Sequence, residues 1–486
     1  MDSRFFLSIF LAYIACLIGL GWLASRRQCS GDDFLLAGRG LPVFLTIGTT
    51  VATMVGTGSS MGAVGFGYAN GWTGTLYGVG GAVGILLLAF CFASVRRLNF
   101  ATMSEEISYY VGANPLVRRL VAVLIFIACI GWLGAHILGG SLYLAWIAEI
   151  DLFAAKLIIA LGFAIFVVVG GYRAVVWTDT LQAIVLFVGF VLMAVLAVQQ
   201  VGGWESLLAA QSGPGTSTAS ENTGGILHGV SLVVVIAVGV LATPSFRQRI
   251  YSARSEQTVR RSFLASGILY LFFCAVPAII GMAAFALNPE LDNRNFAFPY
   301  LAMEVLPLGA GMVVLIAGLS ATMSSASSDA VAGVTVLVRD LSFVFRSRAM
   351  DPQREIFYSR AGLVAVIGIA LLLVALSDDL IGYITAMIST VMTGLCVCGL
   401  LGRFWTRFNW QGAVAALSAG AVVSQLVIWT AQDFWGNPAL PSLAAALVAA
   451  VGVSLATPSE TIDAREALQI LQRERRGRLA PLSGQQ

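Results

Sequence analysis

The chain has 486 residues, of which 58% are hydrophobic and only 11% are charged, and its formal net charge is +3. Soluble domains carry about 25% charged residues, so this composition leaves too little polar surface for a water-soluble fold. It also excludes a disordered chain, a disulfide scaffold and a basic nucleic-acid binder, and no nucleic-acid partner is expected. The mean hydropathy of +0.87 is typical of an all-α polytopic protein embedded in a lipid bilayer.

The apolar runs predict about thirteen membrane-spanning helices, because one span needs about 20 apolar residues. The first run is longer than the core of a cleaved signal peptide, and arginines follow it, so we expect a retained helix. The spans are expected at 4–25, 43–67, 72–94, 117–147, 153–172, 178–200, 225–247, 261–287, 308–338, 358–377, 380–402, 410–431 and 439–456. The outer loop 288–307 is expected to hold a short lid helix. The tail 458–486 is polar and amphipathic.

Basic and acidic loops alternate along the chain. Arginine pairs such as Arg96 and Arg97, or Arg247 and Arg249, follow some spans, whereas acidic residues such as Glu290 follow the others. Cytoplasmic loops of membrane proteins retain arginine and lysine. The alternation therefore predicts an N-terminus outside the cell and a C-terminus in the cytoplasm.

Two spans carry helix-breaking residues near their middle. The second contains a glycine and serine run at 56–60, and the seventh contains Pro244 after Thr243. Such breaks are tolerated in a bilayer only where the freed backbone lines a cavity or contacts protein. Because the broken spans are five spans apart, 43–200 and 225–402 are predicted to form two five-helix units of opposite orientation, followed by two extra helices at 410–456. An inverted repeat with interrupted first helices is typical of secondary transporters.

The ninth span is unusually polar, with five serines, one threonine and one aspartate between 320 and 329. Ala321, Ser324 and Ser325 share one helix face by their spacing. Hydroxyl and carbonyl oxygens are the ligands that a hard cation prefers. This face is therefore a candidate half of a sodium site, and freed carbonyls of the second span are candidates for the other half. The alternative is that small residues here only allow close helix packing.

Three further polar residues lie within or beside spans. Asp179, at the start of the sixth span, is a functional candidate or a helix N-terminal charge. Asp329 is a candidate ion-path carboxylate or the partner of an arginine, and His136 is a substrate or proton contact or a packing residue. The sequence holds no Walker motif and no nucleophile elbow, so no enzymatic activity is expected. The seven cysteines suggest no disulfide framework and no metal site. Sodium is the only metal ion expected.

Four stretches are similar to those of the sodium:solute symporter family, which includes proline, pantothenate, monocarboxylate, sialic acid and sugar symporters. They are residues 34–39, residues 170–179 with Gln182, residues 321–328 followed by 339–341, and residues 402–405 with 409–413. The resemblance covers residues 5–456. It implies the inverted-repeat fold of the leucine transporter, with additional N- and C-terminal helices, and sodium-coupled import of a small organic solute.

The resemblance also implies the ion ligands. The shared sodium ion is expected on the carbonyls of Ala52, Val55 and Ala321 and the hydroxyls of Ser324 and Ser325. Some members bind a second sodium ion, and the residue types of that second site are present at Asp179, Ser324, Ser327 and Ser328. One sodium ion is therefore expected and a second is allowed.

The substrate pocket departs from several branches of the family. Met54 stands where the proline symporter has an aspartate, and the fourth span lacks the arginine of the sialic acid symporters. The sequence favours a small carboxylate or zwitterion and a bacterial inner-membrane location. Proton coupling through Asp179 or His136, or a transporter-like membrane sensor, are the alternatives. The candidate substrate contacts are Thr57, Gly58, Ser59, Trp132, His136, Thr243 and Ser245.

Overall fold

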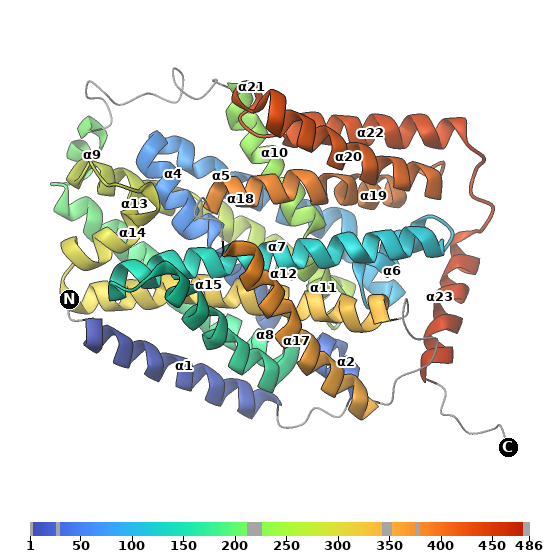
Figure 1. The fold of residues 1–486 in the computed structure, drawn as a ribbon, viewed down its shortest axis with the longest axis horizontal. Coiled ribbons are helices and arrows are strands. Elements are labelled where there is room, and N and C mark those ends of the chain that lie inside the picture. The colour runs from blue at the N-terminus through green and yellow to red at the C-terminus, as the bar shows by residue number, and fades with distance from the viewer. Residues whose placement is uncertain (1–2, 26–29, 211–225, 343–351, 376–379, 480–486) are drawn as a thin grey trace.

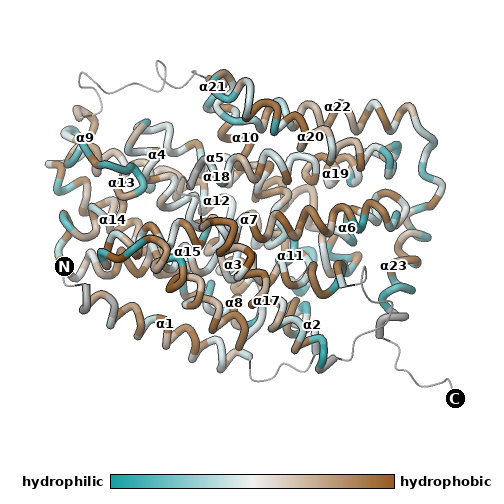
Figure 2. Tube along the Cα trace, viewed as in Figure 1, coloured by the Kyte–Doolittle hydropathy of each residue, from teal (hydrophilic) through white to brown (hydrophobic). Residues whose placement is uncertain are grey.

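The computed structural model describes residues 3–25, 30–210, 226–342, 352–375 and 380–479. Within these ranges the fold is all-helical, and the only β contact is an isolated bridge between Leu41 and Ala253. Apolar residues cover most helices, and hydrophilic residues concentrate at helix ends and in the short helices (Figure 2). This distribution is the one expected for a chain whose solvent is a bilayer.

The described residues up to 210 form nine α-helices. They are α1 (Ser3–Ser25), α2 (Gly31–Leu36), α3 (Val43–Met54), α4 (Ala63–Asn70), α5 (Thr75–Leu87), α6 (Met103–Tyr110), α7 (Pro115–Ala148), α8 (Leu152–Gln200) and α9 (Trp204–Ala210). A π-helical turn at Gly58–Gly62 links the α3 break to α4. The connection between the predicted spans 178–200 and 225–247 thus contains α9, and residues 211–225 lie outside the described ranges.

The second part begins with the broken pair α10 (Ile226–Ala242) and α11 (Pro244–Ser252). The remaining helices are α12 (Glu256–Phe273), α13 (Ala275–Leu287), α14 (Ala297–Tyr300), α15 (Leu308–Val336), α17 (Pro352–Val374), α18 (Leu380–Met387), α19 (Thr393–Phe404), α20 (Trp410–Thr430), α21 (Gln432–Trp435), α22 (Ala439–Ala456) and α23 (Ala464–Leu479). The short α14 is the helix predicted in the loop 288–307.

Ten helical stretches in the described part are long and apolar enough to cross a membrane, or up to eleven if the bent pair α10 and α11 forms one span. This number is lower than thirteen because some stretches contain parts of two predicted spans. The 49 residues of α8 contain both 153–172 and 178–200. The stretch Gly58–Leu98 contains the second half of 43–67 and all of 72–94.

Gly171 divides α8 into two helical halves. Its backbone is non-helical, with φ 56° and ψ −163°. Glycine adopts positive φ without the steric cost that a side chain imposes. A Cβ at this position would also lie 2.8 Å from the ring and 2.9 Å from the carbonyl oxygen of Phe34. The two predicted spans 153–172 and 178–200 are therefore distinct helices joined by a glycine kink.

The helix α15 lies at the centre of the molecule. It packs against α7, α8, α3 and α17, and all of its residues from 317 to 336 are buried. Helices α1 and α22 lie at opposite edges of the view, and α23 stands across one end of the bundle (Figure 1). The polar face of α15 is thus enclosed by protein rather than exposed to lipid.

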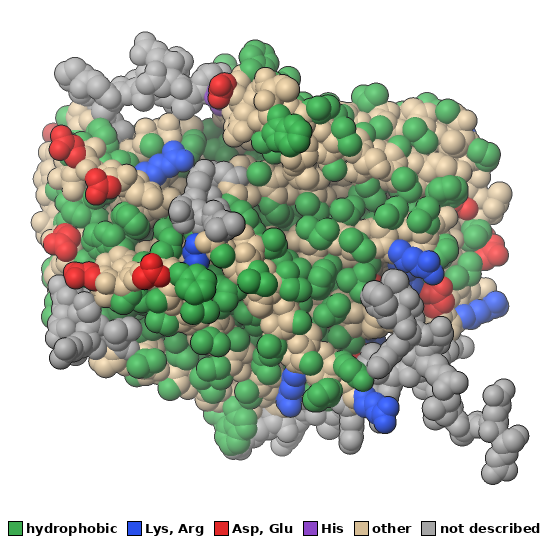
Figure 3. Space-filling view, in the orientation of Figure 1, with side chains coloured by type: hydrophobic (Ala, Val, Ile, Leu, Met, Phe, Trp, Pro, Cys, Tyr) green, Lys and Arg blue, Asp and Glu red, His purple; other side chains and the backbone are tan. Residues whose placement is uncertain are grey.

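Charged side chains separate between the two ends of the bundle. Figure 3 shows most acidic side chains of this face at the end where the N-terminus lies, and most basic side chains in the opposite half, where some acidic side chains lie as well. Arg247 and Arg249, which the sequence groups with the loop arginines, are an exception because both are fully buried in α11. The remaining segregation follows the alternation of basic and acidic loops.

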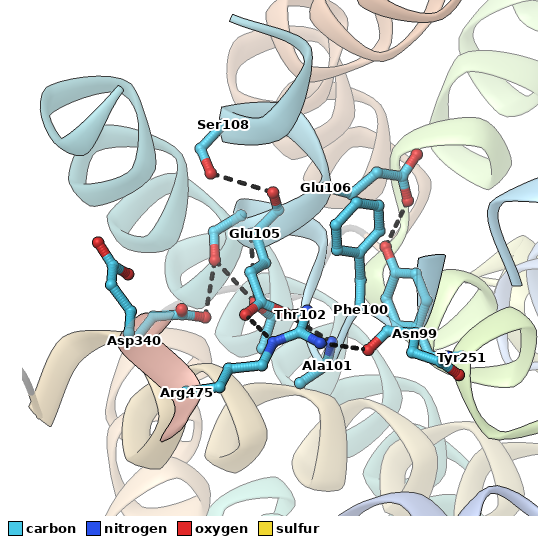
Figure 4. Close-up of polar contacts among 12 residues, drawn as sticks. Asn99, Phe100, Ala101, Thr102, Glu105, Glu106, Ser108, Tyr251, Asp340 and Arg475 are labelled. Atoms are coloured by element: carbon cyan, nitrogen blue, oxygen red, sulfur yellow. Dashed lines mark hydrogen bonds and ion pairs between the residues drawn. The ribbon is translucent and has the colours of Figure 1, made fainter. Parts of the chain in front are cut away.

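The C-terminal helix α23 is attached to this basic end by ion pairs (Figure 4). Both terminal oxygens of Glu105 on α6 accept hydrogen bonds from Arg475, each at 2.7 Å. Burial alone would raise the pKa of Glu105, but the hydrogen bonds and charge of Arg475 and the charge of Arg118 outweigh it and hold this pKa below its usual value. Arg118 also pairs with Asp340, which follows α15, and with Glu474 on α23.

Candidate functional site

Both predicted helix breaks are present. Helix α3 ends at Met54, and its last backbone hydrogen bond joins the Val55 amide to the Val51 carbonyl at 2.9 Å. Helix α10 ends at Ala242, and α11 begins at Pro244 with a bend of 43°. The last carbonyls of a helix have no partner within it. Each break therefore presents backbone oxygens in the interior of the bundle.

The end of α3 meets the polar face of α15. The Ser324 hydroxyl donates to the Ala52 carbonyl at 3.1 Å and to the Ala321 carbonyl at 3.3 Å. The Ser325 hydroxyl donates to the Thr53 carbonyl at 3.3 Å. Val55, the remaining expected ligand, is the fully buried C-cap residue that directly follows α3. The structure thus joins three of the five expected oxygen donors, those of Ala52, Ala321 and Ser324, by hydrogen bonds, while Ser325 contacts the neighbouring Thr53 carbonyl.

These oxygens form a suitable cradle for a small hard cation. All of them are uncharged carbonyl or hydroxyl oxygens, and Ala52, Ala321, Ser324 and Ser325 are completely buried. The Ser324 and Ser325 hydroxyls donate their protons to neighbouring carbonyls, so their own lone pairs stay available to a cation. A cation between the two helices would receive lone pairs from both groups, and it would hold α3 against α15.

The residues expected for a second ion do not all converge. Ser324 already belongs to the oxygen group at the end of α3 described above. Ser327 donates to the Ser324 carbonyl within its own helix at 2.9 Å. Ser328 donates instead to the Asp179 carboxylate at 3.1 Å, and Thr49 donates to the same oxygen at 2.6 Å. Asp179 is completely buried, so its carboxylate lies in the interior of the bundle.

The guanidinium of Arg249 lies against this carboxylate. One of its nitrogens, Nη2, is 3.6 Å from Asp179 Oδ2. The same nitrogen contacts the Thr49 carbonyl and hydroxyl at 3.0 and 2.8 Å, the Ser328 hydroxyl at 2.9 Å and the Thr53 hydroxyl. No specific sequence signal indicated this contact, because an arginine next to a span is usually a loop residue.

A cavity of about 50 Å³ lies beside the α3 break. Five of the seven candidate substrate contacts line it, namely Gly58, Ser59, Trp132, His136 and Thr243. Thr57 is not in the lining but contacts His136, and Ser245 is buried beyond the break that precedes α11. Tyr77, Phe246 and Tyr270 also line the cavity, and the sequence did not indicate them because aromatic residues are common in membrane spans.

His136 and Asp329 form a buried pair at this cavity. His136 Nε2 lies 3.1 Å from Asp329 Oδ2, and His136 Nδ1 lies 2.9 Å from the Thr57 hydroxyl. Trp132 stacks on the imidazole, with 6.1 Å between ring centroids. Within the described ranges, the other oxygen of Asp329, Oδ1, has no hydrogen-bond partner. The partner of Asp329 is thus a histidine and not an arginine, and one carboxylate oxygen remains available to a solute.

Comparison with known proteins identifies relatives over most of the chain. A model of the sodium:solute symporter family matches residues 34–420. The sodium/pantothenate symporter of Escherichia coli (strain K12) is 25% identical over 455 residues, which cover 90% of this chain and 94% of that protein. Solute carrier family 5 member 4 of Rattus norvegicus is 24% identical over 89% of this chain and 72% of its own length.

Solved structures of transporters share the fold. A Na⁺-coupled sialic acid symporter in a substrate-bound outward-open state superposes with a TM-score of 0.82 at 18% identity, over 93% of this chain and 98% of that one. A nucleobase-cation-symport-1 family transporter superposes with a TM-score of 0.60 at 14% identity, over 93% and 99% of the two chains. These matches agree with the leucine-transporter-like fold that the family resemblance implies.

Proposed function

The chain belongs to the sodium:solute symporter family and is a sodium-coupled solute symporter, and we propose that it imports a small carboxylate or zwitterion by alternating access. The observation that carries the ion site is the contact between the broken end of α3 and the hydroxyls of Ser324 and Ser325. The proposed ligands are the carbonyls of Ala52, Val55 and Ala321 with those two hydroxyls. The chain is a transporter and not an enzyme.

Sodium at this position couples the two helices to the transport cycle. The ion favours the state in which α3 and α15 are held together, and substrate in the adjacent cavity then closes the outer path. Coupling requires only that each ligand binds the two states with different affinity. A membrane potential adds about 2.3 kcal/mol per charge per 100 mV, in proportion to the distance moved.

The test of the ion site is the thermal stability of the purified protein in NaCl and in KCl of equal concentration. We expect a higher unfolding temperature in NaCl, because a ligand that binds only the folded state stabilises it, by about 2.7 kcal/mol at 100 times its Kd. Ser325→Ala is expected to abolish the difference between the salts. Ser359→Ala is the control, since Ser359 is a buried serine on α17 that bonds to the Glu355 carbonyl.

Equal stability of the wild-type protein in both salts would contradict this sodium site. A sodium effect that persists in Ser325→Ala would place the ion elsewhere. Loss of the effect in Ser359→Ala as well would show that any buried serine substitution removes it, and it would contradict the specific role of Ser325.

The proposed substrate site is the cavity beside the α3 break. No described lining residue of this cavity is an arginine or lysine. A substrate carboxylate would therefore be held by the adjacent sodium ion or by backbone amides at a helix N-terminus. The free Oδ1 of Asp329 favours a solute whose other end carries a hydrogen-bond donor, such as an ammonium, amide or hydroxyl group.

This chemistry predicts a ranking in a ligand screen. In NaCl, pantothenate or a small amino acid such as proline is expected to raise the unfolding temperature, whereas glucose and myo-inositol are not, because they lack a carboxylate. Asp329→Asn is expected to weaken the effect of the active ligand, since the amide replaces an acceptor with a donor. Stabilisation by the sugars alone would contradict the proposed substrate class.

The membrane orientation and the repeat are part of the same proposal. The end of the bundle that holds Arg118, Arg475 and α23 is proposed to be cytoplasmic, in agreement with the positive-inside rule. The N-terminus is then outside, and the tail lies at the inner surface of a bacterial plasma membrane. The broken pairs α3–α4 and α10–α11 support two inverted five-helix units at 43–200 and 225–402, with α20 and α22 as additions.

A further inference from the structure

The surroundings of Arg249 resemble a cation site more than a hydrogen-bonding site. Its Nη2 atom has two protons, but four oxygens lie around it: the Thr49 carbonyl and hydroxyl, the Thr53 hydroxyl and the Ser328 hydroxyl. Two N–H bonds cannot point at four acceptors. The guanidinium attracts the remaining oxygens through its positive charge, which interacts with their lone pairs.

The hydroxyls are oriented by the carboxylate behind them. Thr49 and Ser328 donate their protons to Asp179 Oδ2, at 2.6 and 3.1 Å. Their lone pairs are therefore free to face the guanidinium. Carboxylate and hydroxyl oxygens with a backbone carbonyl are the donor set that proteins use for hard cations. Here a side-chain nitrogen occupies the position that such a cation would take.

The charge balance and the engagement of the other ligands both oppose an additional ion. The side chains of Arg249 and Asp179 are completely buried, so water does not screen them. The positive charge of Arg249 already balances the negative charge of Asp179, and burying a further unpaired charge is costly. The other two residues allowed for a second sodium ion are engaged elsewhere, since Ser324 contacts Ala52 and Ser327 contacts the Ser324 carbonyl.

We propose that the guanidinium of Arg249 is the resident cation of the oxygen group formed by Thr49, Thr53, Ser328 and Asp179, so that one sodium ion is bound per chain. This inference rests on the proposed sodium site and specifies its stoichiometry. Arg249 is carried by α11, directly after the break, and it ties that segment to α3 through Thr49 and Thr53 and to α15 through Ser328. The protein thereby supplies permanently a charge that would otherwise come from solution.

The test is the number of ²²Na⁺ ions bound per chain, measured by equilibrium dialysis of the purified full-length protein. We expect one ion per wild-type chain, none in Ser325→Ala and one in Ser327→Ala. Arg249→Met removes the resident charge but retains an aliphatic side chain, and this variant is expected to bind two sodium ions. Arg249→Lys retains the charge and is expected to bind one.

Two ions in the wild-type protein, with one lost in Ser327→Ala, would overturn the inference while leaving sodium coupling intact. A folded Arg249→Met protein that still binds one ion would also overturn it. If Arg249→Met does not fold, the counts for wild type and Ser327→Ala decide between one site and two. Absence of saturable ²²Na⁺ binding in the wild-type protein would contradict the proposed sodium site itself, and the inference with it.

Discussion

Gly56→Ala is expected to abolish the sodium-dependent stabilisation and to lower sodium-driven uptake at least about tenfold. A Cβ at Gly56 would lie 2.5 Å from the Ser325 hydroxyl oxygen and 3.1 Å from the Thr53 carbonyl oxygen. The added methyl group therefore enters the ion site itself. Overpacking of this kind costs about 1–3 kcal/mol, and each 1.4 kcal/mol lost from binding weakens it about tenfold.

The measurement is the apparent affinity for sodium, taken from thermal stability as a function of NaCl concentration. Gly368→Ala is a matched control, because a Cβ at Gly368 in α17 meets nothing within 4 Å. That substitution is expected to leave the sodium dependence intact. Unchanged sodium affinity in Gly56→Ala would show that the ion does not lie between the α3 break and Ser325.

Glu106→Gln is expected to destabilise the protein by about 3–5 kcal/mol, the cost of breaking a buried ion pair. Glu106 on α6 accepts a hydrogen bond from Arg247 Nη1 at 3.0 Å, and both side chains are about 2% exposed or less. Tyr110 and Tyr251 donate to the same carboxylate. Neutralising it leaves the charge of Arg247 buried, with its guanidinium 3.5 Å from the centroid of the Phe92 ring.

The loss of stability in Glu106→Gln is measured as a lower midpoint of unfolding in mixed micelles of increasing SDS content. The control is Arg97→Gln, which breaks the pair with Glu256 where the arginine side chain is 75% exposed. Exposed pairs contribute about 0–1 kcal/mol, so the control is expected to unfold near the wild-type midpoint. Equal midpoints for the two variants would show that the Glu106 cluster is no more important to stability than a surface pair.

The elements that carry function were largely predictable because the bilayer restricts what a sequence can do. A glycine and serine run at 56–60 and Pro244 in a span must interrupt a helix, and both breaks are present. Serines at Ser324 and Ser325 in an apolar span require polar partners, and they contact the freed carbonyls of α3. In each case a polar group without a partner in an apolar medium costs free energy, so the sequence predicts that the group contacts another polar group.

The roles of the two arginines of α11 were not predictable in this way. Positive charge beside a span is ordinarily a topological signal, and the sequence grouped Arg247 and Arg249 with the loop arginines. Both are buried, because Glu106 and Asp179 reach them from α6 and α8 across long separations in sequence. Likewise Tyr77 and Tyr270 line the cavity beside the α3 break only because α5 and α12 pack there.

The sequence by itself therefore determined the membrane class, the breaks, the family and the polar face of α15, because these follow from local hydropathy and from residue types at fixed spacing. Only the tertiary structure decided how the polar groups are paired. It placed Ser324 with Ala52, Asp329 with His136, and Arg249 with Asp179 and Ser328. A buried charge must find a partner, but which partner it finds depends on the arrangement of helices that local sequence does not specify.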